Sequence, residues 1–372
     1  MAQERRKGKK MSLNHIRALQ KKLIEKGAGA ALFADKLNQR YLSGFDFDDG
    51  YVLVTGKNAY LITDFRYIEA AKAASASFME VVAPDRGMLT AYMTDLLGSN
   101  GCKSVLIEEE TLPYAAYGRL CEKFAGVAVE PGASEILSAL RLYKTEEELA
   151  AMARAQAITD AAFAHIVKTI RPGEMTEIDV ALEMECFMRS HGASGLAFDT
   201  IVASGSASSR PHAVPRNQKL ERGFLTLDFG AKADGYCSDM TRTIVLGKAD
   251  AEMKKLYNTV LRAQTEALAA AREGASCFGL DKIARDIING AGYEGRFGHS
   301  LGHGVGLFIH EEPRLAPGAP ADRLLVRGQT FTVEPGIYIE GLYGCRIEDM
   351  CCIRPDGTMF DFTQSPKELI EI

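Results

Sequence analysis

The chain lacks any apolar run close to the roughly 18 residues that a membrane helix needs, and its N-terminus lacks the apolar core of a secretory signal. We therefore expect a cytoplasmic protein with no membrane partner. A strong excess of charge is also missing, because 44 Lys and Arg residues stand against 49 Asp and Glu residues. A formal net charge of −5 provides no global attraction to nucleic acid, so we expect recognition at local sites.

Cysteine is present but lacks the patterns that would give it a structural role. The eight cysteines are scattered, without the paired spacing of a zinc ribbon or the density of a disulfide scaffold. We expect them to be reduced and mostly buried. The 372 residues, 47% of them hydrophobic and 25% charged, are enough for a substantial core and have the composition of globular proteins.

The first part of the sequence indicates a short leader and an α/β domain. Residues 1–10 are rich in Lys and Arg and have no large apolar residue beyond Met1, which predicts a disordered basic leader. Apolar residues recur at helical spacing over 13–26, and short apolar runs follow at 30–34, 51–54, 59–63 and 104–107. This alternation predicts a domain over 11–136 that mixes helices and strands.

The pattern changes near Pro131, and a second domain is expected over 137–372. Helices are predicted at about 145–170, 176–191, 251–272 and 279–291, with strands between and after them. Acidic residues and histidines cluster in this part of the chain. We therefore expect the chemistry in the second domain.

Two strand pairs of this domain carry acidic residues at matching positions. In the first, segments 225–230 and 236–243 flank a turn over 232–235. With that turn centred between Ala233 and Asp234, Asp228 and Asp239 would face each other on adjacent strands. Like charges directly opposed at about 4.5–5.5 Å destabilise a sheet unless a cation lies between them. For this hairpin alone, the alternative is that one aspartate caps a turn or pairs with Arg242.

The second pair repeats the arrangement, since Glu334 and Glu348 are symmetric about Gly341, although Pro335 makes the register less certain. Between the two pairs, the glycine-rich segment 298–311 contains His303, a nitrogen donor among glycines that permit close backbone approach. Four carboxylates and one imidazole suit two divalent ions better than one structural zinc. Mn²⁺ or Co²⁺ is favoured, and Zn²⁺ is possible.

In this order, Asp228, Asp239, His303, Glu334 and Glu348 resemble the ligands of the pita-bread-fold dinuclear metallopeptidases. That family includes methionine aminopeptidases, Xaa-Pro aminopeptidases and prolidases (Xaa-Pro dipeptidases). The resemblance extends over the chain from Met11, because residues 38–45 are similar to the creatinase-type N-terminal domain of the proline-specific members. It implies an α/β (α+β) architecture, with a creatinase-like N-terminal domain followed by a pita-bread catalytic domain.

The resemblance also implies a role for each ligand. Asp228 would chelate one metal, Asp239 and Glu348 would bridge both, and His303 with Glu334 would complete the second. Two divalent ions are implied, with Mn²⁺ most expected. A metal-bridging hydroxide would attack the scissile carbonyl, and Glu334 would carry its proton to the leaving proline nitrogen.

Four further residues match positions outside the ligand set. His212 and His310 match two histidines that would hydrogen-bond the substrate carbonyl or the tetrahedral intermediate, with a purely structural role as the alternative. Arg346 matches an arginine thought to orient the ligand carboxylates, and Tyr236 is a weaker candidate for that role.

The choice within the family depends on how the peptide continues beyond proline. A dipeptidase must bind the free carboxylate of proline, and Arg314 matches a carboxylate-binding arginine of prolidases. Arginine is also found there in related aminopeptidases, where it would be a solvated surface residue. We expect an Xaa-Pro aminopeptidase that acts on peptides with proline at the second position, with an Xaa-Pro dipeptidase as the alternative. A homodimer is the assembly that the resemblance implies.

Two other classes are remote alternatives. The segment 298–302 fits G-x-S-x-G, which would make Ser300 the nucleophile of a serine hydrolase. That motif needs a preceding strand and a following helix, whereas Gly304 and Gly306 would interrupt such a helix. The other alternative is a metal-free pita-bread protein that serves as a binding or scaffold module, and the presence of all five ligand types argues against it.

Overall fold

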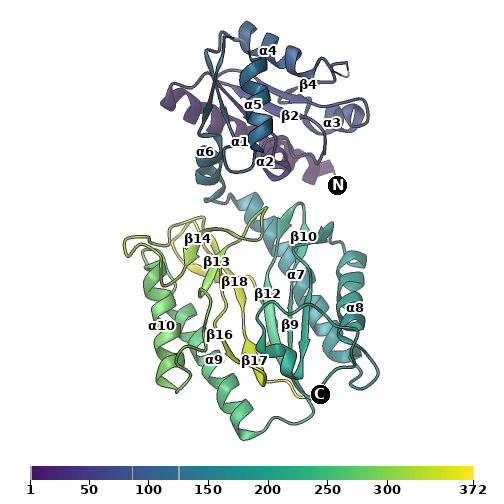
Figure 1. Ribbon diagram of the computed structural model, residues 1–372, viewed down its shortest axis with the longest axis vertical. Coiled ribbons are helices and arrows are strands. Elements are labelled where there is room, and N and C mark those ends of the chain that lie inside the picture. The colour runs from purple at the N-terminus through teal and green to yellow at the C-terminus, as the bar shows by residue number, and fades with distance from the viewer. Residues whose placement is uncertain (1, 86, 125) are drawn as a thin grey trace. The chain divides into compact units, whose positions relative to one another are not determined.

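The protein is described by a computed structural model that covers residues 2–85, 87–124 and 126–372 (Figure 1). Its chain forms two compact units, Met1–Arg141 and Leu142–Ile372. Each unit combines helices with β-sheet, so the expectation of an α/β (α+β) architecture is confirmed.

The first unit is built around one six-stranded mixed sheet with the strand order β4-β3-β2-β1-β5-β6. Strand β2 runs antiparallel to both β1 and β3, whereas β4, β5 and β6 each add in parallel to a neighbour. The apolar runs predicted as strands form β1, β2, β3 and β5, whose buried side chains form the core with helices α4 and α5. In chain order the elements are α1 (Ala2–Lys26), β1 (Ala30–Phe33), α2 (Lys36–Ser43), β2 (Tyr51–Thr55), β3 (Ala59–Ile62), α3 (Ile68–Ser75), β4 (Glu80–Val82), α4 (Leu89–Ser99), β5 (Ser104–Ile107), α5 (Tyr114–Lys123), β6 (Ala128–Pro131) and α6 (Ala133–Arg141).

Both ends of the first unit differ from the sequence prediction. Helix α1 begins at Ala2, so the segment 1–10 that we expected to be a disordered leader is helical from its second residue. The Ala, Gln, Glu, Arg and Lys residues of this segment are good helix formers, and the segment contains no proline that would stop the helix. The unit also ends after Arg141 rather than after residue 136. The reason is that α6 packs on this unit through buried Ile136 and Leu137.

The second unit contains four long helices, and their predicted limits are confirmed within two residues at every end. Thr145 and Thr176 form capping boxes at the starts of α7 and α8, and the side chains of Asp250 and Ser276 cap α9 and α10. The helices and the 3₁₀-helix are α7 (Glu146–Thr169), α8 (Glu177–Ser190), η1 (Gly205–Ser209), α9 (Ala251–Ala270) and α10 (Cys277–Gly290). The strands are β7 (Gly195–Leu196), β8 (Ile201–Ser204), β9 (Gly223–Phe229), β10 (Ala231–Ala233), β11 (Tyr236–Cys237), β12 (Met240–Leu246), β13 (Gly302–Gly304), β14 (Glu311–Leu315), β15 (Thr330–Val333), β16 (Gly336–Ile339), β17 (Tyr343–Arg346), β18 (Asp349–Ile353) and β19 (Met359–Asp361).

These elements form two halves, each with its own core. Helices α7 and α8 pack on β9 and β12, whereas α9 and α10 pack on the strands β15 to β18. Figure 1 shows the two helix pairs on the outside of the second unit, with the strands between them. The central strands β9, β12, β15 and β18 carry or adjoin the acidic residues singled out in the sequence, so these side chains converge in the middle of the unit.

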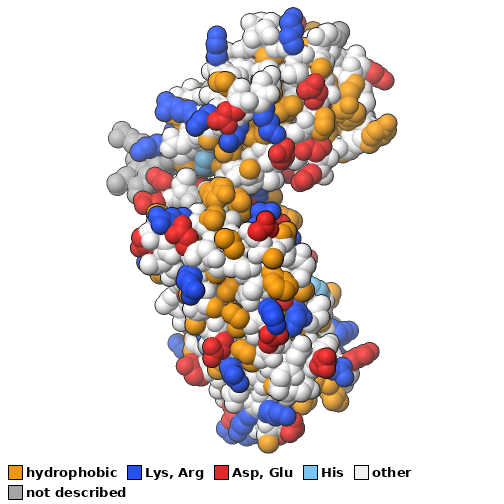
Figure 2. Space-filling view, turned by 90° about the vertical axis from the view of Figure 1, so that its left-hand side faces the viewer, with side chains coloured by type: hydrophobic (Ala, Val, Ile, Leu, Met, Phe, Trp, Pro, Cys, Tyr) orange, Lys and Arg blue, Asp and Glu red, His pale blue; other side chains and the backbone are white. Residues whose placement is uncertain are grey.

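The surface agrees with the balanced composition. Figure 2 shows basic and acidic side chains interspersed on the face in view, rather than separated into patches of one sign. Among the residues that the structure describes, no helix combines the length and the apolarity that crossing a bilayer would require.

Candidate metal centre

The first acidic hairpin has a register that differs from the predicted one by two residues. Asp228 lies opposite Thr241, so it is not directly opposed to Asp239. The turn is centred on Asp234 and Gly235, both of which have positive φ angles of 50° and 86°. Asp-Gly is a preferred pair for such two-residue hairpin turns. Asp228 and Asp239 are therefore diagonal neighbours on one face of the hairpin, a separation that one cation can still span.

The second acidic pair has the predicted register. The ladder between β16 and β17 and the ladder between β15 and β18 are both symmetric about Gly341. Glu334 follows β15 directly and Glu348 precedes β18 directly, so these two residues lie at equivalent positions on the two sides of Gly341. The expected symmetry of Glu334 and Glu348 about Gly341 is confirmed.

His303 reaches the acidic residues from β13, a strand that depends on its glycines. A Cβ atom on Gly302 would lie 2.0 Å from the carbonyl oxygen of Thr332, and one on Gly304 would lie 2.0 Å from that of Glu312. Only glycine permits this approach, which brings the imidazole between the two halves of the unit.

The imidazole presents a free lone pair to the carboxylates. Its Nδ1 lies 3.0 Å from the carbonyl oxygen of Gly304, which can only accept, so Nδ1 carries the proton. The unprotonated Nε2 lies 3.5 Å from Asp239 Oδ2 and 3.3 Å from Glu334 Oε1. Burial lowers the pKa of His303 to about 3, so the ring is neutral at physiological pH. A lone pair that faces two carboxylate oxygens calls for a cation between them.

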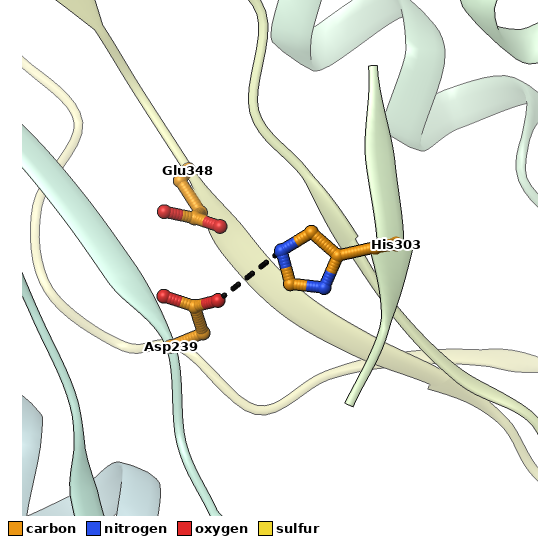
Figure 3. Close-up of side chains that lie close together, drawn as sticks. All are labelled: Asp239, His303 and Glu348. Carbon is orange, nitrogen blue, oxygen red and sulfur yellow. Dashed lines mark ion pairs between the residues drawn. The ribbon is translucent and has the colours of Figure 1, made fainter. Parts of the chain in front are cut away.

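Asp239, His303 and Glu348 form the tightest group (Figure 3). All three are buried, and each offers a ligand atom within 4.8 Å of the others. Figure 3 shows the three side chains pointing toward one another from separate elements. Oxygen and nitrogen donors converging in this way fit a divalent cation.

The electrostatics of the carboxylates support the same conclusion. Burial raises the pKa of Glu334 to about 8, and it raises those of Asp239 and Glu348 well above their usual range, with neighbouring carboxylates adding to the effect. Arg346 Nη2 contacts Asp228 Oδ2 at 2.6 Å, but the buried Oδ1 of Asp228 has no hydrogen-bond partner in the described structure. The carboxylates would be costly to bury as anions unless metal ions compensate them.

Hydroxyl groups orient two of these carboxylates. Thr241 Oγ1 donates to Glu348 Oε2 at 2.7 Å, and Thr332 Oγ1 donates to Glu334 Oε1 at 3.1 Å. Support of this kind fixes ligand oxygens before a metal binds.

The predicted substrate-binding residues lie at the edge of this cluster. The His310 ring stands edge-to-face against that of His303, with centroids 4.5 Å apart. Burial lowers the pKa of His310, and the nearby charges of Arg314 and His212 lower it further. Arg314 lies opposite His303 in the ladder between β13 and β14, and its side chain is exposed. The fold thus brings His212, His310 and Arg314 close to the cluster.

Two residues near Arg346 were missed by sequence reasoning. Arg346 Nη1 donates to Tyr338 Oη at 2.8 Å, and Tyr338 Oη lies 3.0 Å from His299 Nε2. Since His299 Nδ1 must donate to the carbonyl oxygen of Ser300, Nε2 accepts from Tyr338. In the sequence, Tyr338 follows Glu334 by four residues, and His299 precedes His303 by four residues. This spacing from the expected ligands was the signal that could have pointed to both residues.

Tyr236 and Ser300 have other surroundings. The Tyr236 hydroxyl donates to Glu148 Oε1 at 2.7 Å, a structural contact that holds β11 against the first turn of α7. Ser300 lies in the loop between α10 and β13 and is followed by a strand. A nucleophile elbow needs a strand before the serine and a helix after it, so the serine hydrolase alternative is wrong.

Comparison with known proteins agrees with this geometry. Residues 150–355 match the model of metallopeptidase family M24, and residues 15–143 match that of the creatinase/prolidase N-terminal domain. The chain belongs to metallopeptidase family M24. The resemblance to the pita-bread peptidases is thereby confirmed, as is a creatinase-type domain ahead of the catalytic one.

Similar proteins cover almost the whole chain. The solved structure of an Xaa-Pro dipeptidase from Bacillus anthracis is 40% identical, with a TM-score of 0.91 over 97% of this chain and 100% of that one. The X-Pro aminopeptidase from Thermotoga maritima is 34% identical, with a TM-score of 0.87 over 93% and 98% of the two chains. An Xaa-Pro dipeptidase of Pyrococcus horikoshii is 37% identical over 94% of this chain and 98% of its own. Both peptidase types are therefore among the similar proteins of this M24 member.

Proposed function

We propose that this M24 metallopeptidase hydrolyses the Xaa-Pro bond of dipeptides with the help of two divalent metal ions, with Mn²⁺ favoured. The observation that carries the proposal is the group of carboxylates at the free Nε2 lone pair of His303. Oxygens of Asp239 and Glu334 lie 3.5 Å and 3.3 Å from Nε2, and Glu348 offers a ligand atom in the same cluster. Oxygen-rich donor sets of this kind suit Mn²⁺, and Co²⁺ or Zn²⁺ is compatible with them.

Five residues would hold the ions. Asp228 would chelate one ion, His303 and Glu334 would complete the other, and Asp239 and Glu348 would bridge them. In support, His303 contacts both Asp239 and Glu334, and Asp239 and Glu348 share one ligand cluster with it. Bound ions would activate water for attack on the scissile carbonyl and stabilise the negative charge that develops on its oxygen.

The protein side chains would supply the proton transfer and the substrate contacts. Glu334 would take up the proton of the attacking water and pass it to the proline nitrogen as that nitrogen leaves. Its place in the cluster, with Oε1 3.3 Å from His303 Nε2, supports this role. His310 and His212 would donate hydrogen bonds to the carbonyl oxygen of the substrate. Their place at the edge of the buried cluster supports this role.

Arg314 is the basis for preferring a dipeptidase. Its guanidinium is exposed on β14, opposite the ligand His303, and its charge acts on His310. A cation at this edge of the site would bind the free carboxylate that proline carries in a dipeptide. The Bacillus anthracis and Pyrococcus horikoshii relatives support this choice by name. The Xaa-Pro aminopeptidase expected from the sequence is the second candidate, favoured by the likeness to the Thermotoga maritima enzyme.

The test compares hydrolysis of Ala-Pro and Ala-Pro-Ala by the Mn²⁺-loaded protein and by Arg314→Ala. For a dipeptidase we expect Ala-Pro to be the better substrate, and the variant should lose about 10–100-fold in kcat/KM for it, as for a charged hydrogen bond. Arg272→Ala, at another exposed arginine of the same unit, is the matched control and should have no effect. Preferred cleavage of the tripeptide, unchanged in Arg314→Ala, would establish the aminopeptidase. No cleavage of either peptide would overturn both candidates.

A further inference from the structure

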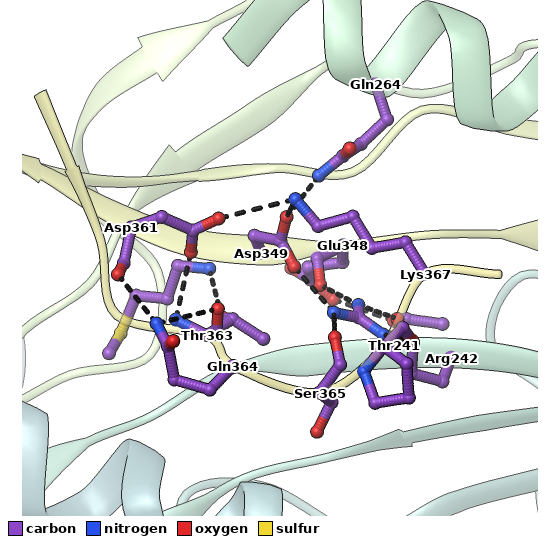
Figure 4. Close-up of polar contacts among 12 residues, drawn as sticks. Thr241, Arg242, Gln264, Glu348, Asp349, Asp361, Thr363, Gln364, Ser365 and Lys367 are labelled. Atoms are coloured by element: carbon purple, nitrogen blue, oxygen red, sulfur yellow. Dashed lines mark hydrogen bonds and ion pairs between the residues drawn. The ribbon is translucent and has the colours of Figure 1, made fainter.

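A second buried charged cluster adjoins the metal centre and is centred on Arg242 (Figure 4). The Arg242 side chain is 1% exposed, and all five of its N–H groups have acceptors. Nε donates to the carbonyl oxygen of Pro366 at 3.0 Å, and Nη2 donates to that of Ser365 and to Asp349 Oδ1, both at 2.8 Å. A buried guanidinium with every donor satisfied is held in one position.

The remaining Nη1 group binds the main chain next to a metal ligand. It donates to the carbonyl oxygen of Glu348 at 2.6 Å and to that of Thr241 at 2.9 Å. The N–H of Glu348 in turn donates to the carbonyl oxygen of Thr241 at 3.1 Å. Arg242 therefore links the main-chain carbonyl groups of Thr241 and Glu348, and it holds the backbone of Glu348 next to β12.

The two faces of β12 support Glu348 in different ways. On one face, the Thr241 hydroxyl donates to the Glu348 carboxylate. On the other face, Arg242 binds the Glu348 carbonyl and the Asp349 carboxylate. Because consecutive side chains of a strand alternate, Glu348 points to the metal centre and Asp349 points away from it. Thr241 thus holds the side chain of Glu348, while Arg242 holds the Glu348 main chain and the Asp349 side chain.

Lys367 is a second cation on Asp349, but it has a different set of contacts. Its Nζ pairs with Asp349 Oδ2 and with Asp361 Oδ2, the latter at 3.3 Å, and Gln264 Nε2 also donates to Asp349. No contact between the Lys367 side chain and the Glu348 main chain is present among the described residues. Arg242 and Lys367 therefore share one carboxylate, while only Arg242 also binds Glu348.

We propose that Arg242 is a positioning residue of the metal centre, which fixes the backbone of Glu348 so that its carboxylate stays directed at the metal ions. This inference rests on the proposed function, because it takes Glu348 as a metal ligand. Arg242 would then influence metal affinity although it is not a metal ligand itself. The C-terminal segment that accepts its hydrogen bonds would share this role.

The test measures Mn²⁺ affinity of the full chain by calorimetric titration in three proteins: wild type, Arg242→Lys and Lys367→Met. Lysine keeps the charge near Asp349 but cannot reproduce the fork of donors. We expect Arg242→Lys to weaken Mn²⁺ binding by about 10–100-fold, the usual loss when support of a ligand is removed. Lys367→Met disturbs the same carboxylate and should change the affinity by less than about threefold, within the scatter of uncoupled sites.

Urea unfolding of the same metal-free proteins separates positioning from general destabilisation. We expect both variants to unfold at lower urea concentration, whereas only Arg242→Lys loses Mn²⁺ affinity. Equal loss of affinity in both variants, or no loss in Arg242→Lys, would overturn the inference.

Should Arg242→Lys fail to fold, the double variant Arg242→Met with Asp349→Asn removes both charges together, which buried pairs often tolerate, and it should show the same weakened binding. A wild-type protein that binds no Mn²⁺, Co²⁺ or Zn²⁺ would instead overturn the proposed function, and this inference with it.

Discussion

Glu348 and Asp349 are neighbours in the sequence and are both buried, yet they belong to clusters with opposite charge balance. On the Asp349 side, two carboxylates are matched by two cations, since Asp349 and Asp361 contact Arg242 and Lys367. Figure 4 shows hydrogen bonds that join this cluster to surrounding side chains, and Arg242 donates further hydrogen bonds to main-chain carbonyl groups. The protein alone compensates these charges.

The Glu348 side lacks such a match. Four carboxylates contact or adjoin one another there, Arg346 is the cation that binds one of them, and His303 is neutral. Fully ionised, the four carboxylates would place four negative charges against one guanidinium, so three would lack a protein cation. Burial and this repulsion raise the pKa values of Asp239, Glu334 and Glu348 in the metal-free protein. The comparison teaches that burial of carboxylates is not itself a sign of a metal site. The sign is a shortage of protein cations and of hydrogen-bond donors around them, as at Asp228 Oδ1.

The largest effect should come from removing one charge on the uncompensated side. Asp239→Asn keeps the shape of the side chain but takes away a residue proposed to bridge both metal ions, so kcat/KM for Ala-Pro should fall by about 10³-fold or more. Bound Mn²⁺, measured by elemental analysis, should be lost as well. The metal-free variant should melt at a higher temperature than the metal-free wild type, because asparagine removes a buried carboxyl group whose pKa is held above its usual range by burial and by the charges of Asp228 and Glu334. An active variant with full metal content would contradict the bridging role.

The same substitution on the compensated side should have the opposite effect on stability. Asp349→Asn leaves Arg242 and Lys367 without their shared carboxylate, and breaking a buried pair in this way costs about 3–5 kcal/mol. Urea unfolding of the metal-free protein measures the change. If Asp349→Asn were neutral, or if Asp239→Asn destabilised the metal-free protein as strongly, the two clusters would not differ in the way described.

The sequence was sufficient for the elements that depend on local patterns. Periodic apolar residues and caps such as Thr145 and Ser276 located the helices of the second unit. The symmetry of Glu334 and Glu348 about Gly341 also followed from the spacing along the chain. The register of the first hairpin was wrong because the turn was centred one residue too early, although Asp234-Gly235 is a strong turn signal.

The remaining features depend on contacts between distant segments. Tyr338 and His299 meet 39 residues apart, and Arg242 binds the carbonyl oxygen of Ser365 across 123 residues. No local pattern encodes such pairs, because they form only when segments far apart in the sequence pack together. The longer first helix has a similar explanation, since a run of basic residues can be a leader or a solvated part of a helix.

The smallest expected effect is a pH dependence of the stability of the metal-free protein, which bound metal should reduce. In the metal-free protein the pKa of Glu334 is raised to about 8, whereas an unfolded glutamate titrates near 4.5. Between these pH values the folded state binds more protons than the unfolded state, so stability is greatest at low pH and falls as the pH rises toward 8.

Bound Mn²⁺ favours the ionised carboxylates and should remove this slope. We expect the melting temperature of the second unit in the metal-free protein to drop by several degrees from pH 5 to pH 8, since each kcal/mol shifts it by about 2–4 °C in a unit of this size. The Mn²⁺-loaded protein should show a smaller drop or a rise, and Asp239→Asn should show a weaker slope than the wild type because one of the repelling carboxylates is gone. Equal slopes in the metal-free and metal-loaded proteins would mean that the uncompensated charge does not lie at the metal centre.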